Sequence, residues 1–122
     1  MSRVEPLIVD ALQDLIIKDT LYPNGTPDWQ IDTGMATPLN ITGQTYEFVV
    51  HESIGDGLYL RRYDTLTGGC TIPVGTDGML ITTIPLADLQ ALGPGDFVYY
   101  VRRIDAGTNA VMTKGDFSIV SV

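Results

Sequence analysis

The feature that most constrains this chain is an alternation of apolar and polar side chains that begins at Gln44. In the segment 44–52, Tyr46, Phe48 and Val50 share one face of an extended strand, and their neighbours share the other. The same two-residue period recurs downstream in stretches rich in aromatic and β-branched residues, which suit a pleated, half-buried surface. The pattern predicts strands over 44–52, 58–63, Met79–Ile84, 96–104 and 117–122.

Glycine-rich turns separate these predicted strands. Gly55-Asp56-Gly57 follows the first strand, and Asp105-Ala106-Gly107-Thr108 joins the last two. Asp77-Gly78 stands just before Met79 and is a pair that two-residue hairpins favour. Short strands at this spacing predict an all-β fold, an antiparallel sandwich or a barrel.

One short helix interrupts the strands, at Leu86–Leu92. Pro85 stands at its start and Gly93 just past its end, which is the usual asymmetry of proline and glycine at helix termini. Leu86, Leu89 and Leu92 recur every three residues, so we expect this helix to pack on the sheet as a crossover.

The N-terminal third is less regular. Residues 7–17 read LIVDALQDLII, which suits an amphipathic helix with Ile8, Leu12, Leu15 and Ile16 on one stripe, and equally an extended arm or an edge strand. Trp29 follows in a proline-interrupted passage that predicts loops. We therefore divide the chain into an N-terminal arm or helix, 1–16, and a β-sandwich domain, 17–122.

Composition excludes several classes of partner. The 122 residues carry 15 acidic and 7 basic side chains, a net charge of −8, which repels a phosphate backbone and disfavours an anionic lipid surface. We expect neither nucleic acid nor membrane as a partner. Cys70 is the single cysteine, so no intramolecular disulfide forms, and we expect synthesis in a reducing cytoplasm.

The sequence offers little for catalysis. His51 is the only histidine, no Gly-x-Ser-x-Gly elbow surrounds Ser53, and His51 is expected to be a solvated strand residue. The carboxylates gather beside turn glycines, where they satisfy local backbone donors: Asp56, Asp77, Asp96, Asp105 and Asp116. One histidine and one cysteine are too few for a zinc site, and no calcium-loop spacing occurs. We predict no enzyme, no metal site and no cofactor.

Two basic doublets, Arg61-Arg62 and Arg102-Arg103, are the more informative charges. Adjacent residues of a strand point to opposite faces, so a doublet in mid-strand would direct one arginine into the core. Either the strands end there, or one face meets another surface. Since tyrosines lie nearby and Tyr and Arg are enriched at interfaces, Arg102 and Arg103 are candidate subunit contacts.

Several motifs occur in an order that is similar to a known family. Pro38-Leu39-Asn40-Ile41-Thr42-Gly43 precedes the first clear strand, and Thr67-Gly68-Gly69-Cys70-Thr71-Ile72 precedes Asp77-Gly78. The helix leads to Leu92-Gly93-Pro94-Gly95-Asp96-Phe97-Val98-Tyr99, and the chain closes with Gly115-Asp116-Phe117-Ser118-Ile119-Val120. From about residue 17 to 120 this order resembles the small immunoglobulin-like domain of phage virion proteins, including the N-terminal domain of upper baseplate proteins. The irregular, proline-interrupted lead departs from that pattern.

The resemblance implies an antiparallel immunoglobulin-like β-sandwich that acts in a virion, as a capsid decoration or cement protein, a head fibre, or a neck, tail or baseplate adaptor. We expect a homo-oligomer that docks on other virion proteins. The N-terminal apolar residues Leu7, Ile8, Leu12, Leu15 and Ile16 are further candidate contacts. The alternative function is a carbohydrate-binding module that uses Trp29 and exposed tyrosines as stacking platforms.

Overall fold

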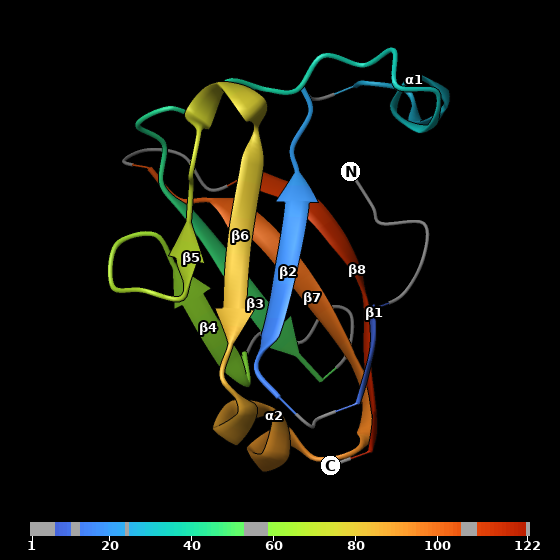
Figure 1. Cartoon of the computed structure of the whole chain (residues 1–122), viewed down its shortest axis with the longest axis vertical. Coiled ribbons are helices and arrows are strands. Elements are labelled where there is room, and N and C mark those ends of the chain that lie inside the picture. The colour runs from blue at the N-terminus through green and yellow to red at the C-terminus, as the bar shows by residue number, and fades with distance from the viewer. Residues whose placement is uncertain (1–6, 11–12, 24, 53–58, 106–109, 122) are drawn as a thin grey trace.

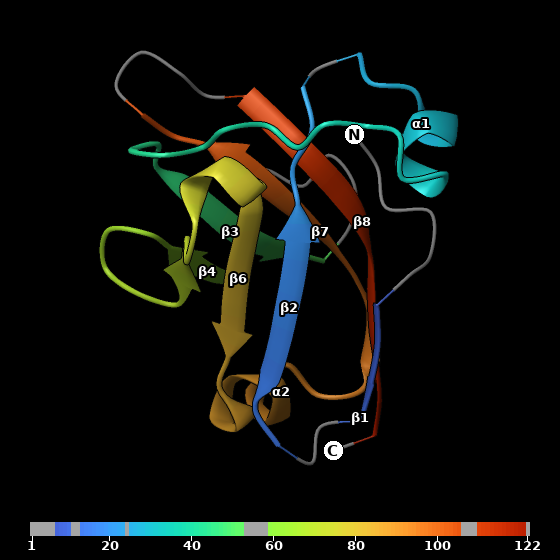
Figure 2. The ribbon, with the colours of Figure 1, turned by 45° about the horizontal axis from the view of Figure 1, so that its top comes forward.

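Two β-sheets lie face to face, with a short helix near each end (Figures 1 and 2). The computed structural model describes residues 7–10, 13–23, 25–52, 59–105 and 110–121. For residues 7–10, 110 and 121 it describes the backbone only. In these ranges no helix has the length and apolar character needed to cross a bilayer. The expected all-β sandwich is confirmed at this level.

The larger sheet has five strands in the order β1-β8-β7-β3-β4. Neighbouring strands are antiparallel except β1, which runs parallel to β8 and pairs Leu7 with Phe117. The strands are β1 (Leu7–Asp10), β3 (Tyr46–His51), β4 (Arg61–Asp64), β7 (Gly95–Arg103) and β8 (Ala110–Ser121).

The smaller sheet has three antiparallel strands in the order β2-β6-β5 and lies in front of the larger one in Figure 1. They are β2 (Leu15–Thr20), β5 (Cys70–Thr71) and β6 (Met79–Ile84). In β6, Leu80, Thr82 and Ile84 are buried and alternate with half-buried residues, as the two-residue period requires.

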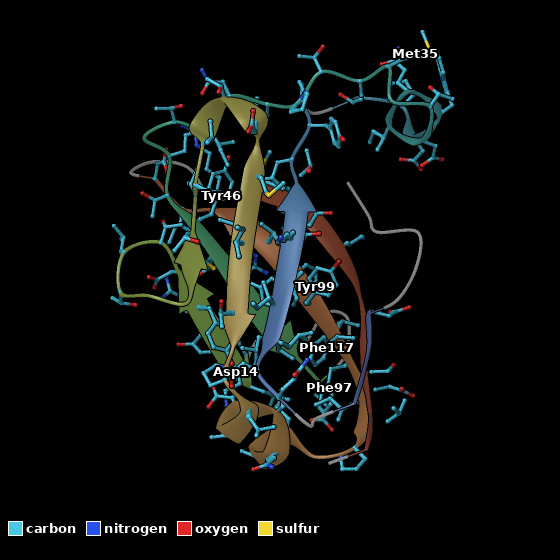
Figure 3. All side chains as sticks on the ribbon, in the orientation of Figure 1. Asp14, Met35, Tyr46, Phe97, Tyr99 and Phe117 are labelled. Carbon is cyan, nitrogen blue, oxygen red and sulfur yellow. The ribbon has the colours of Figure 1, made fainter. Side chains whose placement is uncertain are left out.

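Aromatic side chains fill the space between the sheets. Phe48 of β3 stacks on Tyr99 of β7, and Phe97 lies against Phe117 of β8 (Figure 3). Tyr46, Phe48, Tyr99 and Phe117 are fully buried. Burying a side chain of this size contributes roughly 1.5–3 kcal/mol each, so the four rings together stabilise the sandwich substantially.

The crossover helix α2 (Leu86–Leu92) closes one end of the sandwich, over the residues predicted from the sequence. It buries Leu89, while Asp14 accepts a hydrogen bond from Leu86 N (2.8 Å) just before β2 begins. The hydroxyl of Tyr63 donates to Asp88 Oδ2 (2.7 Å), which ties the helix to β4. The helix thus bridges the two sheets.

Gly78 holds together the opposite end. Leu21 N donates to Gly78 O (2.7 Å) and Leu39 N donates to Leu21 O (2.9 Å), so the segments after β2 and before β3 meet at the start of β6. Gly78 has φ 66°, and a Cβ there would lie 2.7 Å from Leu39 O and 2.9 Å from Leu21 O. Only glycine therefore fits this junction without a shift.

The N-terminal segment forms two edge strands. Of the alternatives that the sequence allowed for residues 7–17, the edge strand is therefore observed and the amphipathic helix is wrong. β1 and β2 both begin within the segment 1–16. Burial along β2 alternates, with Ile17 and Asp19 buried and Ile16 and Lys18 exposed. Pairing with β6 satisfies the backbone of β2, and the two-residue alternation directs Leu15 and Ile17 to the core and Ile16 to solvent.

Four other expectations need correction. β4 starts at Arg61 instead of residue 58, and β8 starts at Ala110 instead of residue 117, since it pairs along the length of β7. Asp77-Gly78 does not make a two-residue hairpin: a 3₁₀ turn, η1 (Gly75–Asp77), ends at the left-handed Gly78. A one-turn helix, α1 (Asp28–Asp32), stands in the passage predicted as loop.

Candidate docking surfaces

The two arginine doublets divide between the two faces of the larger sheet. Arg61 lies opposite Val50 and Arg103 opposite Tyr46, so both arginines are on the core side of the sheet. Each lies at the end of its strand, because Arg61 begins β4 and Arg103 ends β7. Arg61 Nε lies 3.9 Å from Asp88, and Arg103 Nη2 lies 2.8 Å from Asp105. The strands were expected to end at Arg61 and Arg102, but β4 begins at Arg61 and β7 continues through Arg102 to Arg103, so both doublets lie within strands, at one end of each.

The other two arginines lie on the outer face of the same sheet and meet at Glu47. Arg62 Nε pairs with Glu47 Oε2 and its Nη1 pairs with Asp64, while Arg102 Nη1 lies 4.0 Å from Glu47 Oε1. The Arg102 guanidinium also lies over the Tyr100 ring, 5.2 Å from its centroid. We name Glu47, Arg62, Asp64, Tyr100 and Arg102 the outer-face network.

Hydrogen bonds tune the carboxylates beside these arginines. The backbone N–H of Thr67 lowers the pKa of Asp64 against the opposing effect of burial, and the Thr67 hydroxyl and Arg62 lower it further. Burial opposes ionisation of Asp105 as well, yet the pKa of Asp105 is lowered by the Thr45 N–H and Arg103. Both carboxylates are thus held ionised by the turns and strand ends that they close.

His51 is buried, and the expectation of a solvated strand histidine is wrong. Its side chain is 3% exposed and meets the Tyr100 ring edge-on, with centroids 5.3 Å apart. Val49 on the same outer face is also buried, because it lies opposite Arg62 and Tyr100, whose long side chains cover it. Ser53 and Asp56 fall outside the described residues.

Cys70 is buried against β6, with its sulfur 3.4 Å from the Thr82 hydroxyl. Burial raises the pKa of its thiol to about 11, so the thiolate is scarce at neutral pH. Across the described ranges no three His, Cys, Asp or Glu side chains come together as metal ligands could. Asp96 was expected to satisfy a local backbone donor in a turn, but it lies in β7 and accepts from the Ser118 hydroxyl of β8 (2.8 Å).

The N-terminal candidates take different positions. Leu7 and Ile8 pair through their backbones with β8, and Leu12 lies outside the described residues. Leu15 packs against the core, whereas Ile16 is 59% exposed on the outer side of the edge strand β2. The structure therefore brings Ile16 to the surface and uses Leu15 to stabilise the sandwich.

Sequence reasoning considered Trp29 as a surface platform only in the alternative function, and it predicted neither α1 nor the exposure of Met35. Trp29 is 57% exposed in the helix, and Met35 just beyond it is 69% exposed. The signal was available: Pro27, Asp28 and Gly34 are typical helix-start and helix-end residues, although a single turn is too short for a hydrophobic period to register.

The chain matches no protein-family model, and no curated protein has a matching sequence.

Proposed function

We propose that this protein is an immunoglobulin-like structural protein of a bacteriophage virion, which acts by docking on other virion proteins and on copies of itself. It would be made in the host cytoplasm and serve as a capsid decoration or cement protein, a head fibre, or a neck, tail or baseplate adaptor. The motifs that resemble the phage domain support this, since they lie just before β3, over β5, just before β6, from the end of α2 into β7, and within β8.

The strand order is the observation that carries the proposal. One sheet places β8, β7, β3 and β4 side by side and the other places β2, β6 and β5, with β1 added parallel to β8. With β2 to β8 taken as strands B, C, C′, D, E, F and G, this order agrees with the variable-type immunoglobulin arrangement, in which G, F, C and C′ form one sheet and B, E and D lie in the other. Since a fold alone does not determine a role, the virion assignment also depends on the motif resemblance.

The outer-face network supports docking. It combines a tyrosine with a stacked arginine, the residue types enriched at protein interfaces, and it lies on a sheet face instead of a cleft. Ile16 adds an exposed aliphatic side chain on the edge strand β2. We assign self-association to the surfaces around Arg102 and Ile16.

Labelling of particles tests the virion role. Antibodies raised against the purified chain should decorate purified particles of the phage whose genome encodes it, at one defined structure in immunogold electron micrographs. Light scattering after size-exclusion chromatography should give a mass above the 13.3 kDa monomer. Particles that lack the protein altogether would contradict the virion role, and a strictly monomeric chain would contradict self-association.

A carbohydrate-binding module is the second candidate, and the exposure of Trp29 favours it. An aromatic face open to solvent suits stacking on a sugar ring, and Trp29 is the only tryptophan in the chain. A glycan array probed with the wild-type chain and with Trp29→Ala tests this function. Binding that disappears in the variant would support it, and an array without hits would remove it.

A further inference from the structure

Residues 26–37 form a projection that stands outside both sheets, as Figures 1 and 2 agree. We call them the α1 projection. Its base is the junction at which Leu21, Leu39 and Gly78 are joined by backbone hydrogen bonds. All five residues of α1 are described, and none of them is buried. The helix is therefore not held by core packing, which is what normally stabilises so short a helix.

Internal hydrogen bonds hold the projection in place of core packing. Gly34, with φ 74°, ends the helix in a Schellman arrangement: Gly34 N donates to Ile31 O (3.1 Å) and Met35 N donates to Gln30 O (2.9 Å). The Thr33 hydroxyl donates to Trp29 O (2.7 Å), and Thr26 N donates to Pro23 O (3.1 Å). The projection is thus a defined element with its own end structures.

This element presents two large apolar side chains to solvent. The Schellman turn returns the residue after the glycine toward the last turn of the helix, so Met35 lies on the same projection as Trp29. Met35 points away from the body of the molecule at its outer end (Figure 3). An aromatic and a thioether side chain on an ordered, solvent-surrounded element have the character of an interface anchor.

Charge indicates what kind of surface would cover them. Asp28 and Asp32 flank Trp29 in the helix, and residues 22–45 contain no Lys, Arg or His. For this projection a second copy of the chain is a less suitable partner, because its net charge is −8 and four of its seven basic side chains already lie beside an acid of their own chain: Arg61, Arg62, Arg102 and Arg103. The complement is a different protein with a basic rim.

We propose that the α1 projection inserts Trp29 and Met35 into an apolar pocket of a second virion protein whose rim carries Lys or Arg. The class of partner rests on the proposed function; the surface and its chemistry do not. Met35 favours a protein over a sugar as the occupant, because a thioether adapts to an apolar pocket and offers a hydroxyl-rich ligand almost no hydrogen bonding.

Binding of the full chain to particles tests this. Particles of the encoding phage are prepared without the chain by deleting its gene, and the purified chain is added back and co-sedimented. Trp29→Ala combined with Met35→Ala should weaken binding about 30-fold or more, the range of an interface anchor. Leu66→Ala, an equally exposed apolar site on another turn, should change it less than about threefold.

Asp28→Lys with Asp32→Lys should also weaken binding, and salt should weaken the wild-type interaction.

The outcomes distinguish this proposal from the virion role on which its class of partner rests. If wild type and the Trp29/Met35 variant bind the particles equally, the projection is not the docking element while the virion role stands. If the wild-type chain binds no particle, both proposals fall. Saturable glycan binding that requires Trp29, or self-association that requires it, would replace the second virion protein as the occupant. Circular dichroism of every variant should match the wild type, because α1 buries no residue.

Discussion

Phe48 and Tyr99 stack across the two central strands of the larger sheet, with ring centroids 4.9 Å apart and planes 12° from parallel. They are diagonal neighbours, since Phe48 lies opposite Val101 and Tyr99 lies opposite Val50. Both rings are fully buried and face the smaller sheet. This pair therefore links the pairing of β3 with β7 to the packing of the two sheets.

Removing one ring should be the most costly single change in the core. Phe48→Ala is expected to lower the free energy of unfolding by about 3–5 kcal/mol, because the cavity beside Tyr99 cannot be filled by water or by a neighbour. Urea unfolding followed by circular dichroism measures the loss. Val120→Ala, at an exposed position of β8, should change stability by less than about 0.5 kcal/mol. Equal effects would show that the pair does not organise the core.

Gly78→Ala should destabilise the protein for two separable reasons. Alanine at φ 66° costs about 1–2 kcal/mol in backbone strain, and its Cβ would also press on Leu39 O and Leu21 O. Gly43→Ala is the matched control: Gly43 has φ 75°, and a Cβ there meets nothing within 4 Å. We expect Gly78→Ala to exceed Gly43→Ala in loss of unfolding free energy by about 1 kcal/mol or more. Equal losses would mean that the junction relaxes freely.

Acid should unfold the protein partly through Asp64. The pKa of Asp64 is lowered in the folded state, so its contribution is present above its unfolded pKa of about 3.9 and is lost as pH falls through the folded value. The free energy of unfolding should therefore decline below about pH 5. Asp64→Asn removes the ionisation and should flatten this decline, at the cost of lower stability at pH 7. An unchanged acid slope in the variant would contradict this role.

Arg102 and Arg103 should behave differently despite being adjacent. Arg103→Gln is expected to lower stability by about 1 kcal/mol or less, because Arg103 pairs with Asp105, which accepts the Thr45 N–H. Arg102→Gln should leave the free energy of unfolding within about 0.5 kcal/mol while reducing self-association. Thermal unfolding and light scattering on the same samples separate the two effects. Loss of association in the Arg103 variant alone would contradict the assignment to the outer face.

The sequence predicted those elements whose determinants are local. Met79–Ile84 and Leu86–Leu92 were bounded correctly, because the apolar and threonine run of β6 lies between Gly78 and Pro85, and α2 is framed by Pro85 and Gly93. For both elements, the residues that determine the conformation lie within the element or directly beside it in the sequence.

The tertiary structure decided what depends on distant partners. Residues 7–17 suit a helix or a strand equally. They form strands because β1 finds a backbone partner in β8 and β2 finds one in β6, both far along the chain. His51 is buried and meets the Tyr100 ring of the neighbouring strand β7, and Arg103 lies at a strand end because β7 ends there. Trp29 is exposed because α1 leaves the sandwich at the Gly78 junction. Local pattern specifies how a segment alternates, whereas only pairing across the chain specifies what covers it.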